Sequence, residues 1–237
     1  MLFRIGLDIF PGGRALAWAL EHPGCFAGGE TADEALEALP AVFEDYTTWI
    51  HQHSGAPWLP LEPGEYQLEE TWEVYTIDDE YELAEEGYQV NAWFLHDWKP
   101  LSIEDIKRGR QLLEWSHAEL LASAAGLSPE ARQVRLPGER WHVLGILAHV
   151  GGAEWWYLNN LGLSFPRAEL PEDPDERLAR TQAELNRRLP LLAGDQLVVG
   201  VDGEFWSPRK LLRRAVWHVR DHTHHINRLR GLLEAAD

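Results

Sequence analysis

The chain has 237 residues, of which 45% are hydrophobic, so it can fill an ordinary core and its composition excludes a disordered protein. It has no apolar run of 18 residues and no basic leader followed by a long apolar stretch, so we expect a cytoplasmic protein without a membrane span. The formal net charge is -18, and residues 1–100 carry 20 acidic against three basic side chains, which repels phosphate backbones and disfavours nucleic acid as a partner.

Alternating apolar and polar positions predict strands in the first hundred residues. Residues 3–9 have this period, residues 11–13 (Pro-Gly-Gly) predict a turn, and residues 16–20 repeat the period. A hairpin is therefore expected at the start of the chain. Alternation returns at residues 72–76 and 88–94, which predicts two further strands.

One helix is expected between these pairs of strands. Thr31 followed three residues later by Glu34 is the capping-box pattern, and apolar residues continue at helical spacing to about Ile50. Pro40 inside this run predicts a kink or a break, because proline lacks the amide hydrogen that a helix interior needs. Residues 1–98 thus predict a small, acidic α+β domain of order β-β-α-β-β.

The segment leading into this helix resembles a known family. Residues 21–36 (EHPGCFAGGETADEAL) are similar to the HicB-like antitoxin fold, in which a PGC turn and a G-x-T step lead into a capped helix. The resemblance covers about residues 1–55 and implies a HicB-like domain that binds a protein partner. Cys25, the single cysteine, is expected to be a small buried residue, and it excludes an internal disulfide or a zinc-thiolate cluster.

From residue 101 onward the pattern changes to amphipathic helices, which predicts an all-α four-helix bundle over residues 101–237. Ser102, Asp173 and Ser207 stand where helix caps are expected, and the last two precede a proline at the first helical position. Residues 196–206 predict an extended excursion. The expected helices span about residues 102–126, 139–161, 173–189 and 207–234.

Histidines recur on the inner face of the fourth predicted helix. His218, His222 and His225 share the four- and three-residue steps of a buried apolar stripe. The rings of His218 and His222 are expected on one face, about 6 Å apart along the axis, which suits two ligands of one metal. His149 lies near the middle of the second helix, and burying these imidazoles without partners is costly. A shared cation removes that cost, although the spacing alone also fits a hydrogen-bonded core pair.

Two segments carry a second resemblance. Residues 141–150 (WHVLGILAHV) and 206–226, with WSPRK and WHVRDHTHHI, resemble the DinB-like (YfiT-like) bundle family. The resemblance covers about residues 101–237, and its pattern pairs one histidine on the second helix with HxxxH on the fourth. In that family these histidines bind zinc, nickel or a similar divalent ion. The family includes transferases that use low-molecular-weight thiols and proteins described as metal-dependent hydrolases. The resemblance therefore implies a divalent ion on His149, His218 and His222.

Other residues near this site have expected roles. His225 is expected to hydrogen-bond a ligand, with ligation in place of one of the three as the alternative. Asp221 and Glu154 either orient an imidazole, act as a base or are simply exposed charges. His117 is expected to serve packing rather than ligation. Four tryptophans are candidates for the wall of an apolar substrate pocket: Trp155, Trp156, Trp206 and Trp217.

Three functions stay open. Three protein ligands would leave a coordination position for water or a thiol, which predicts a metal-dependent transferase or hydrolase with a small-molecule thiol or an electrophile as substrate. The second is a protein that binds a metal or small molecule without catalysis. The third is an antitoxin-like interaction module, with a basic partner on the acidic domain and a homodimer through the bundle. The absence of an HExxH motif and of a glycine-rich phosphate loop gives no support to a metalloprotease or a nucleotide enzyme.

Overall fold

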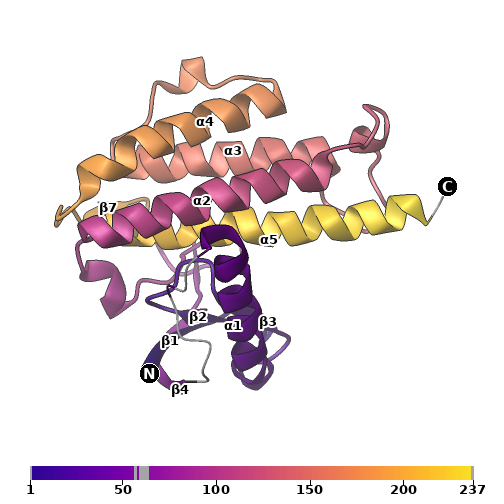
Figure 1. Cartoon of the computed structure of the whole chain (residues 1–237). Helices are drawn as coiled ribbons and strands as arrows, with labels where there is room; N and C mark the ends of the chain where they lie inside the picture. The colour runs from indigo at the N-terminus through magenta and orange to yellow at the C-terminus, as the bar shows by residue number, and fades with distance from the viewer. Residues whose placement is uncertain (1, 56–57, 59–63, 236–237) are drawn as a thin grey trace. The chain divides into compact units, whose positions relative to one another are not determined.

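The computed structural model describes residues 2–55, 58 and 64–235. The chain divides into two compact units, of which unit 1 comprises Met1–Lys99 with Val198–Lys210 and unit 2 comprises Pro100–Leu197 with Leu211–Asp237 (Figure 1). The boundary between Lys99 and Pro100 falls where the sequence pattern changes from strands to helices. Residues 198–210, however, were predicted to belong with the helices, and they pack with unit 1 instead. The predicted domain ends at residues 1 and 236–237 lie outside the described residues.

Unit 1 contains a four-stranded sheet of order β3-β2-β1-β4. The strand β2 (Ala15–Ala19) is antiparallel to both β1 (Leu2–Ile9) and β3 (Phe26–Gly29), and β4 (Glu65–Glu73) pairs in parallel with β1. The expected hairpin is β1 and β2. The strand β3 was not predicted, because its four residues include two glycines and show no alternation. With β3 included, the order of elements through β4 is β-β-β-α-β.

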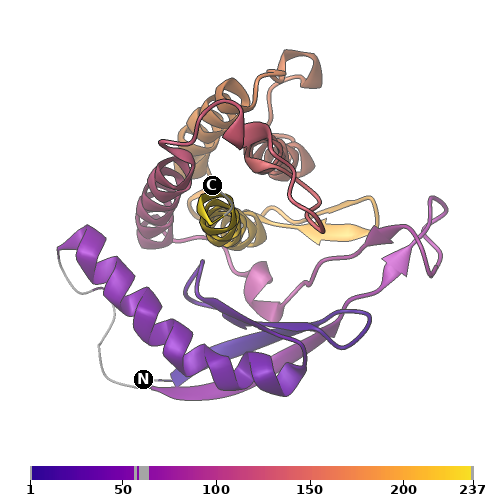
Figure 2. The same ribbon diagram turned by 90° about the vertical axis from the view of Figure 1, so that its right-hand side faces the viewer.

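The helix α1 (Ala32–Ser54) lies across one face of this sheet (Figure 2). The Thr31 hydroxyl accepts a hydrogen bond from the Glu34 amide at 3.2 Å, as its cap pattern predicts. The helix runs unbroken through Pro40, so the predicted break is absent. Buried residues on both sides of the proline, Leu39 and Phe43, hold both halves of the helix against the sheet.

The rest of unit 1 is less regular than predicted. The strands β5 (Thr76–Ile77) and β6 (Tyr88–Gln89) form a two-stranded pair, and residues 90–94 form no strand. Six acidic residues between them disfavour a longer sheet, because aspartate and glutamate are poor strand formers. The short helix η1 (Leu95–Trp98) ends this part. The strands β7 (Val199–Val201) and β8 (Glu204–Trp206) form the extended excursion predicted for residues 196–206.

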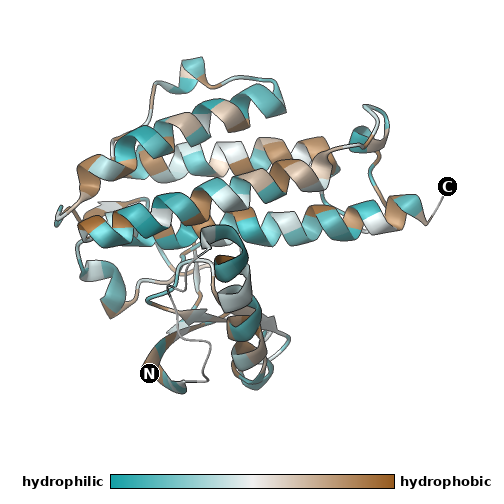
Figure 3. Ribbon diagram, viewed as in Figure 1, coloured by the Kyte–Doolittle hydropathy of each residue, from teal (hydrophilic) through white to brown (hydrophobic). Residues whose placement is uncertain are grey.

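Unit 2 has four α-helices among its described residues: α2 (Ile103–Ala124), α3 (Val143–Asn160), α4 (Pro174–Arg188) and α5 (Pro208–Glu234), whose first three residues belong to unit 1. Figure 2 shows these helices nearly end-on, with α5 beside α2 and α3, and α4 opposite α5. Polar and apolar residues mix along each of them, as in amphipathic helices (Figure 3). No α-helix in the described part of the chain is long and apolar enough to cross a membrane.

Three of these helices begin at their predicted caps. The side chains of Ser102, Asp173 and Ser207 accept hydrogen bonds from backbone amides two or three residues onward, at 2.9 to 3.1 Å. The helix α3 begins later than predicted, at Val143, because the imidazole of His142 caps it by accepting from the Gly145 amide at 3.0 Å. These caps set the point at which each helix enters the bundle.

Close helix contacts fix the orientation of α3 and α5. A Cβ atom on Gly109 of α2 would lie 2.6 Å from the Leu212 side chain of α5, so glycine permits this approach. Gly151 of α3 similarly contacts α4, where a Cβ atom would lie 3.0 Å from the Leu178 backbone nitrogen. The apolar core beside these contacts includes Leu120, Ile146, Leu147, Val150, Val219 and Ile226, all fully buried.

Candidate metal centre

Three imidazoles from two helices of unit 2 converge on one point. The Nε2 atom of His218 lies 3.0 Å from Nε2 of His149 and 3.1 Å from Nε2 of His222. The ligand atoms of all three histidines lie within 4.8 Å of one another. His149 stands at mid-length on α3, and His218 and His222 stand one turn apart on α5. The structure thus brings together the three histidines that the sequence pattern singled out.

The spacing of these nitrogens fits a divalent ion. With metal–nitrogen bonds of about 2.0–2.1 Å, two ligand nitrogens lie about 2.9 Å apart at a right angle and about 3.4 Å apart at a tetrahedral angle. The observed 3.0 and 3.1 Å fall between these limits. A neutral imidazole has one N–H and one lone pair, and three Nε2 atoms facing one another cannot all be satisfied by mutual hydrogen bonds. A cation accepts all three lone pairs, so the residues present suit one.

Burial keeps all three imidazoles neutral. It lowers the pKa of His149, with Arg140 contributing, and lowers the pKa of His218 well below its usual value, with the other two imidazoles and Arg214 contributing. Burial lowers the pKa of His222 to about 3, with His149 and His225 contributing. Because the neutral form carries the lone pair, the cluster is in its metal-binding state at neutral pH.

Aromatic side chains line the cluster. Trp141 stacks on His149 with ring centroids 4.4 Å apart and an angle of 23° between the planes. The rings of Trp217 and Tyr157 lie 5.6 and 6.1 Å from the His218 ring. Neither Trp141 nor Tyr157 was among the predicted site residues. Tyr157 is eight residues from His149 on α3, about two helical turns, and this spacing was the available signal.

The predicted tryptophan wall is only partly present. Trp217 contacts the His218 ring, whereas Trp155 is buried and donates its indole N–H to the Phe165 carbonyl at 2.9 Å. Trp156 packs against Tyr157 at 5.6 Å, and Trp206 belongs to β8 of unit 1 rather than to the bundle. The helical period of the sequence cannot predict the partner of each tryptophan, because that partner depends on which elements pack against the indole.

The other predicted site residues have different partners. His225 is bonded through Nε2 to the Glu139 carboxylate at 2.9 Å, so this bond goes to a carboxylate rather than to a histidine of the cluster. Glu154 is fully buried and bonded to His117, so it is no exposed charge. No described protein atom is hydrogen-bonded to Nδ1 of His218 or His222, so neither Glu154 nor Asp221 orients these two rings.

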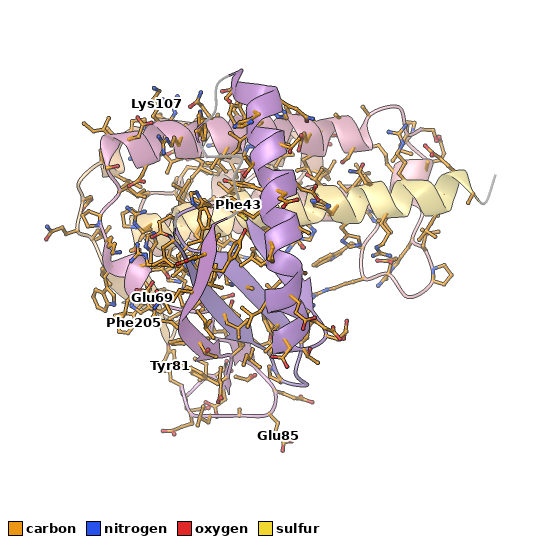
Figure 4. All side chains as sticks on the ribbon, turned by 60° about the horizontal axis from the view of Figure 1, so that its bottom comes forward. Phe43, Glu69, Tyr81, Glu85, Lys107 and Phe205 are labelled. Carbon is orange, nitrogen blue, oxygen red and sulfur yellow. The ribbon has the colours of Figure 1, made fainter. Side chains whose placement is uncertain are left out.

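A cavity of about 800 Å³ lies elsewhere in unit 2, between α2 and α4. Lys107 and Arg110 of α2 and Gln182 and Asn186 of α4 are among the residues that line it, and Figure 4 shows Lys107 on α2. None of the three clustered histidines contributes to it. The predicted substrate pocket beside the metal is therefore not this cavity.

Fold and site together define a protein in which an α+β unit accompanies a helical unit with a three-imidazole cluster. No family model matches the chain, and no curated protein matches it. Among solved structures the chain is similar to YfiT from Bacillus subtilis, described as "a probable metal-dependent hydrolase with an unusual four-helix bundle topology". The similarity has 21% sequence identity and a TM-score of 0.45, and it covers 59% of this chain and 95% of that one. At these values it assigns neither an activity nor a ligand to this chain.

Proposed function

We propose that unit 2 binds one divalent transition metal ion, zinc or nickel, through Nε2 of His149, His218 and His222. The observation that carries this proposal is that Nε2 of His218 lies 3.0 Å from Nε2 of His149 and 3.1 Å from Nε2 of His222, with ligand atoms of all three within 4.8 Å of one another. Three neutral, largely buried lone pairs directed at one point repel one another unless a cation lies between them. The same spacing permits only one ion for the three rings.

We further propose that this centre is enzymatic, as a thiol-dependent transferase or a hydrolase. Three ligands leave a coordination position open, and a bound metal would supply an activated water or thiolate there. His149 is half-buried, so the cluster reaches the surface on the α3 side. Gly152, one turn beyond His149, supports access from that side, because a Cβ atom placed on it would meet nothing within 4 Å.

A metal-binding protein without catalysis is the second candidate. Two observations favour it: the 800 Å³ cavity lies away from the histidines, and the group of clustered ligand atoms includes no carboxylate among the described residues. A hydrolase normally needs a general base close to the bound water. The two candidates differ in whether a small exogenous ligand can reach the metal.

The metal content of the purified full-length chain tests the site. We expect one equivalent of bound metal in the native chain and a loss of stoichiometric metal in His149→Ala, His218→Ala and His222→Ala. His224→Ala is the matched control, because His224 lies on α5 only two residues beyond His222 but is exposed. Unchanged metal in the three variants, or equal loss in the control, would place the ion elsewhere.

Loading the protein with cobalt(II) separates an enzyme from a closed binding site. We expect the visible absorption spectrum to change when 2-mercaptoethanol is added, because a thiolate at the open position gives a new charge-transfer band. Gly152→Trp is expected to keep the cobalt but to lose this response, since the indole would fill the open space beside His149. A native spectrum that thiol leaves unaltered would contradict the enzymatic proposal and favour the second candidate.

A further inference from the structure

Two arginines flank the histidine cluster, each placed on a tryptophan that contacts a clustered ring. The Cζ atom of Arg140 lies 4.5 Å from the Trp141 ring centroid, and Trp141 stacks on His149. The Cζ atom of Arg214 lies 4.3 Å from the Trp217 ring centroid, next to His218. The same arrangement thus occurs twice, once on the segment before α3 and once on α5.

Neither arginine has an ion-pair partner among the described residues. The Nε atom of Arg214 is buried without a hydrogen-bond partner in the described part of the chain. The nearest acidic residue in sequence to Arg140 is Glu139, and its carboxylate is bonded to Arg228 at 2.6 Å and His225 at 2.9 Å. These hydrogen bonds, with Arg228 the stronger cause, lower the pKa of Glu139 to about 2. Glu139 is therefore an anion whose oxygens are already engaged, and the two guanidinium groups lack a carboxylate.

This arrangement suits recognition of an anion. An indole face holds the guanidinium plane in place and leaves its N–H edge free to donate. Guanidinium edges bind carboxylate and phosphate oxygens with two parallel hydrogen bonds. Three neutral imidazoles leave the full charge of a divalent ion uncompensated, which adds to the attraction for a negative ligand.

We infer that the molecule that reacts at the cluster carries an oxyanionic group, a carboxylate or a phosphate, which is bound by Arg140 and Arg214. This inference rests on the proposed metal centre and adds a substrate class to it. A metal on the three histidines would supply an open coordination position for the reacting atom, and Arg140 and Arg214, over Trp141 and Trp217, would hold the oxyanion. Arg140 and Arg214 are specificity-determining residues in this arrangement, not metal ligands.

Two thiols that differ in a carboxylate test the inference on the cobalt(II)-loaded full-length protein. Mercaptoacetate has the carboxylate and 2-mercaptoethanol has a hydroxyl in its place, and the dissociation constant of each is measured by visible absorption. We expect mercaptoacetate to bind about tenfold more tightly or better, as hydrogen bonds between charged groups allow. Competition of acetate and inorganic phosphate with mercaptoacetate then shows which oxyanion is preferred.

Variants of the two arginines locate the effect. We expect Arg140→Ala and Arg214→Ala each to reduce the preference for mercaptoacetate and the double variant to abolish it, with cobalt content unchanged. Arg214→Lys should restore part of the preference, because charge returns without the planar fork. Arg110→Ala is the matched control: it removes the same charge from the cavity between α2 and α4.

The outcomes distinguish the two proposals. Equal affinity for the two thiols, or a preference that survives in the double variant, overturns the role of the arginines while the metal site stands. A preference lost in Arg110→Ala places the oxyanion in the α2–α4 cavity and also overturns it. Absence of cobalt binding in the native chain overturns the metal centre itself, and the inference with it.

Discussion

His117 on α2 has surroundings opposite to those of the three clustered histidines. It is 1% exposed and bonded through Nε2 to the carboxylate of Glu154 on α3. The other oxygen of Glu154 accepts a hydrogen bond from the Thr181 hydroxyl on α4 at 3.2 Å. Burial acts to lower the pKa of His117, but the charge and hydrogen bond of Glu154, with the Leu113 carbonyl, outweigh it and the pKa is raised. The bundle interior therefore holds an ion pair between α2 and α3, and a hydrogen bond links this pair to α4.

This pair predicts a pH dependence of stability. Because the pKa of His117 in the folded state lies above its usual value of 6.5, its contribution is fully present below pH 6.5 and is lost as pH rises through the folded-state pKa. We expect the difference in unfolding free energy between the native chain and His117→Gln to shrink over that rise. Urea unfolding of metal-free protein, from about pH 6 to about pH 9, measures it. A difference independent of pH would mean that His117 is neutral in the fold.

For contacts between individual side chains, the sequence predicts some and not others. The convergence of His149 with His218 and His222 was predicted from the helical period and the mid-helix positions together with the resemblance to a bundle family, because the spacing alone also fits a hydrogen-bonded core pair. The contact between His117 and Glu154 was not, because the two are 37 positions apart and their pairing depends on which faces of α2 and α3 meet. Glutamate is also rarely buried, so an exposed charge was the reasonable expectation.

Among the elements, the hairpin β7–β8 is held within unit 1 by a buried ion pair. Nζ of Lys210 lies 2.6 Å from the carboxylate of Glu204, and both side chains are almost fully buried. The second carboxylate oxygen accepts hydrogen bonds from the Tyr88 hydroxyl and from Asn91 Nδ2, the latter at 2.9 Å. The ammonium group also lies 4.9 Å from the Trp206 ring centroid. This network explains why residues 198–210 pack with unit 1.

Removing one partner of this pair should be costly. We expect Lys210→Met to lower the free energy of unfolding by about 3–5 kcal/mol, because it leaves the Glu204 carboxylate buried without its cation. Adding Glu204→Leu to this variant should recover most of the loss. Urea unfolding of the native chain, both single variants and the double variant gives the coupling energy. If the double variant is no more stable than Lys210→Met, the charges are not paired in solution.

Local signals account for the elements that were predicted well. The caps Ser102, Asp173 and Ser207 engage backbone groups only two or three residues away, so the sequence alone defines them. The strand β3 depends instead on pairing with β2, and the packing of residues 198–210 depends on contacts more than 100 positions away. Contacts between residues so far apart produce no local periodicity in the sequence. The HicB-like assignment of residues 1–55 stays a prediction.

Across the whole molecule, the charge lies almost entirely in residues 1–100, which hold 20 acidic and three basic side chains for a net charge of -17. The remaining 19 acidic and 18 basic side chains give -1. The loop between β5 and β6 is a concentrated part of this acidic surface, and Figure 4 shows Tyr81 and Glu85 on it. Tyr81 is 59% exposed and Leu83 77% exposed there. Like charges held this close oppose the compact state.

Salt should therefore stabilise the protein, and the effect should belong to the acidic region. Between about 0.01 M and about 1 M NaCl the Debye length falls from about 30 Å to about 3 Å, so repulsion among the exposed carboxylates is screened and the free energy of unfolding rises.

Glu82→Gln with Glu85→Gln removes two exposed charges from the acidic region, and Glu114→Gln with Glu172→Gln removes two from the nearly neutral remainder. Urea unfolding at both salt concentrations should show a smaller salt effect in the first double variant only. Any general effect of salt on apolar burial acts on both variants alike. Equal salt effects in the two variants would mean that repulsion is not concentrated in the first hundred residues.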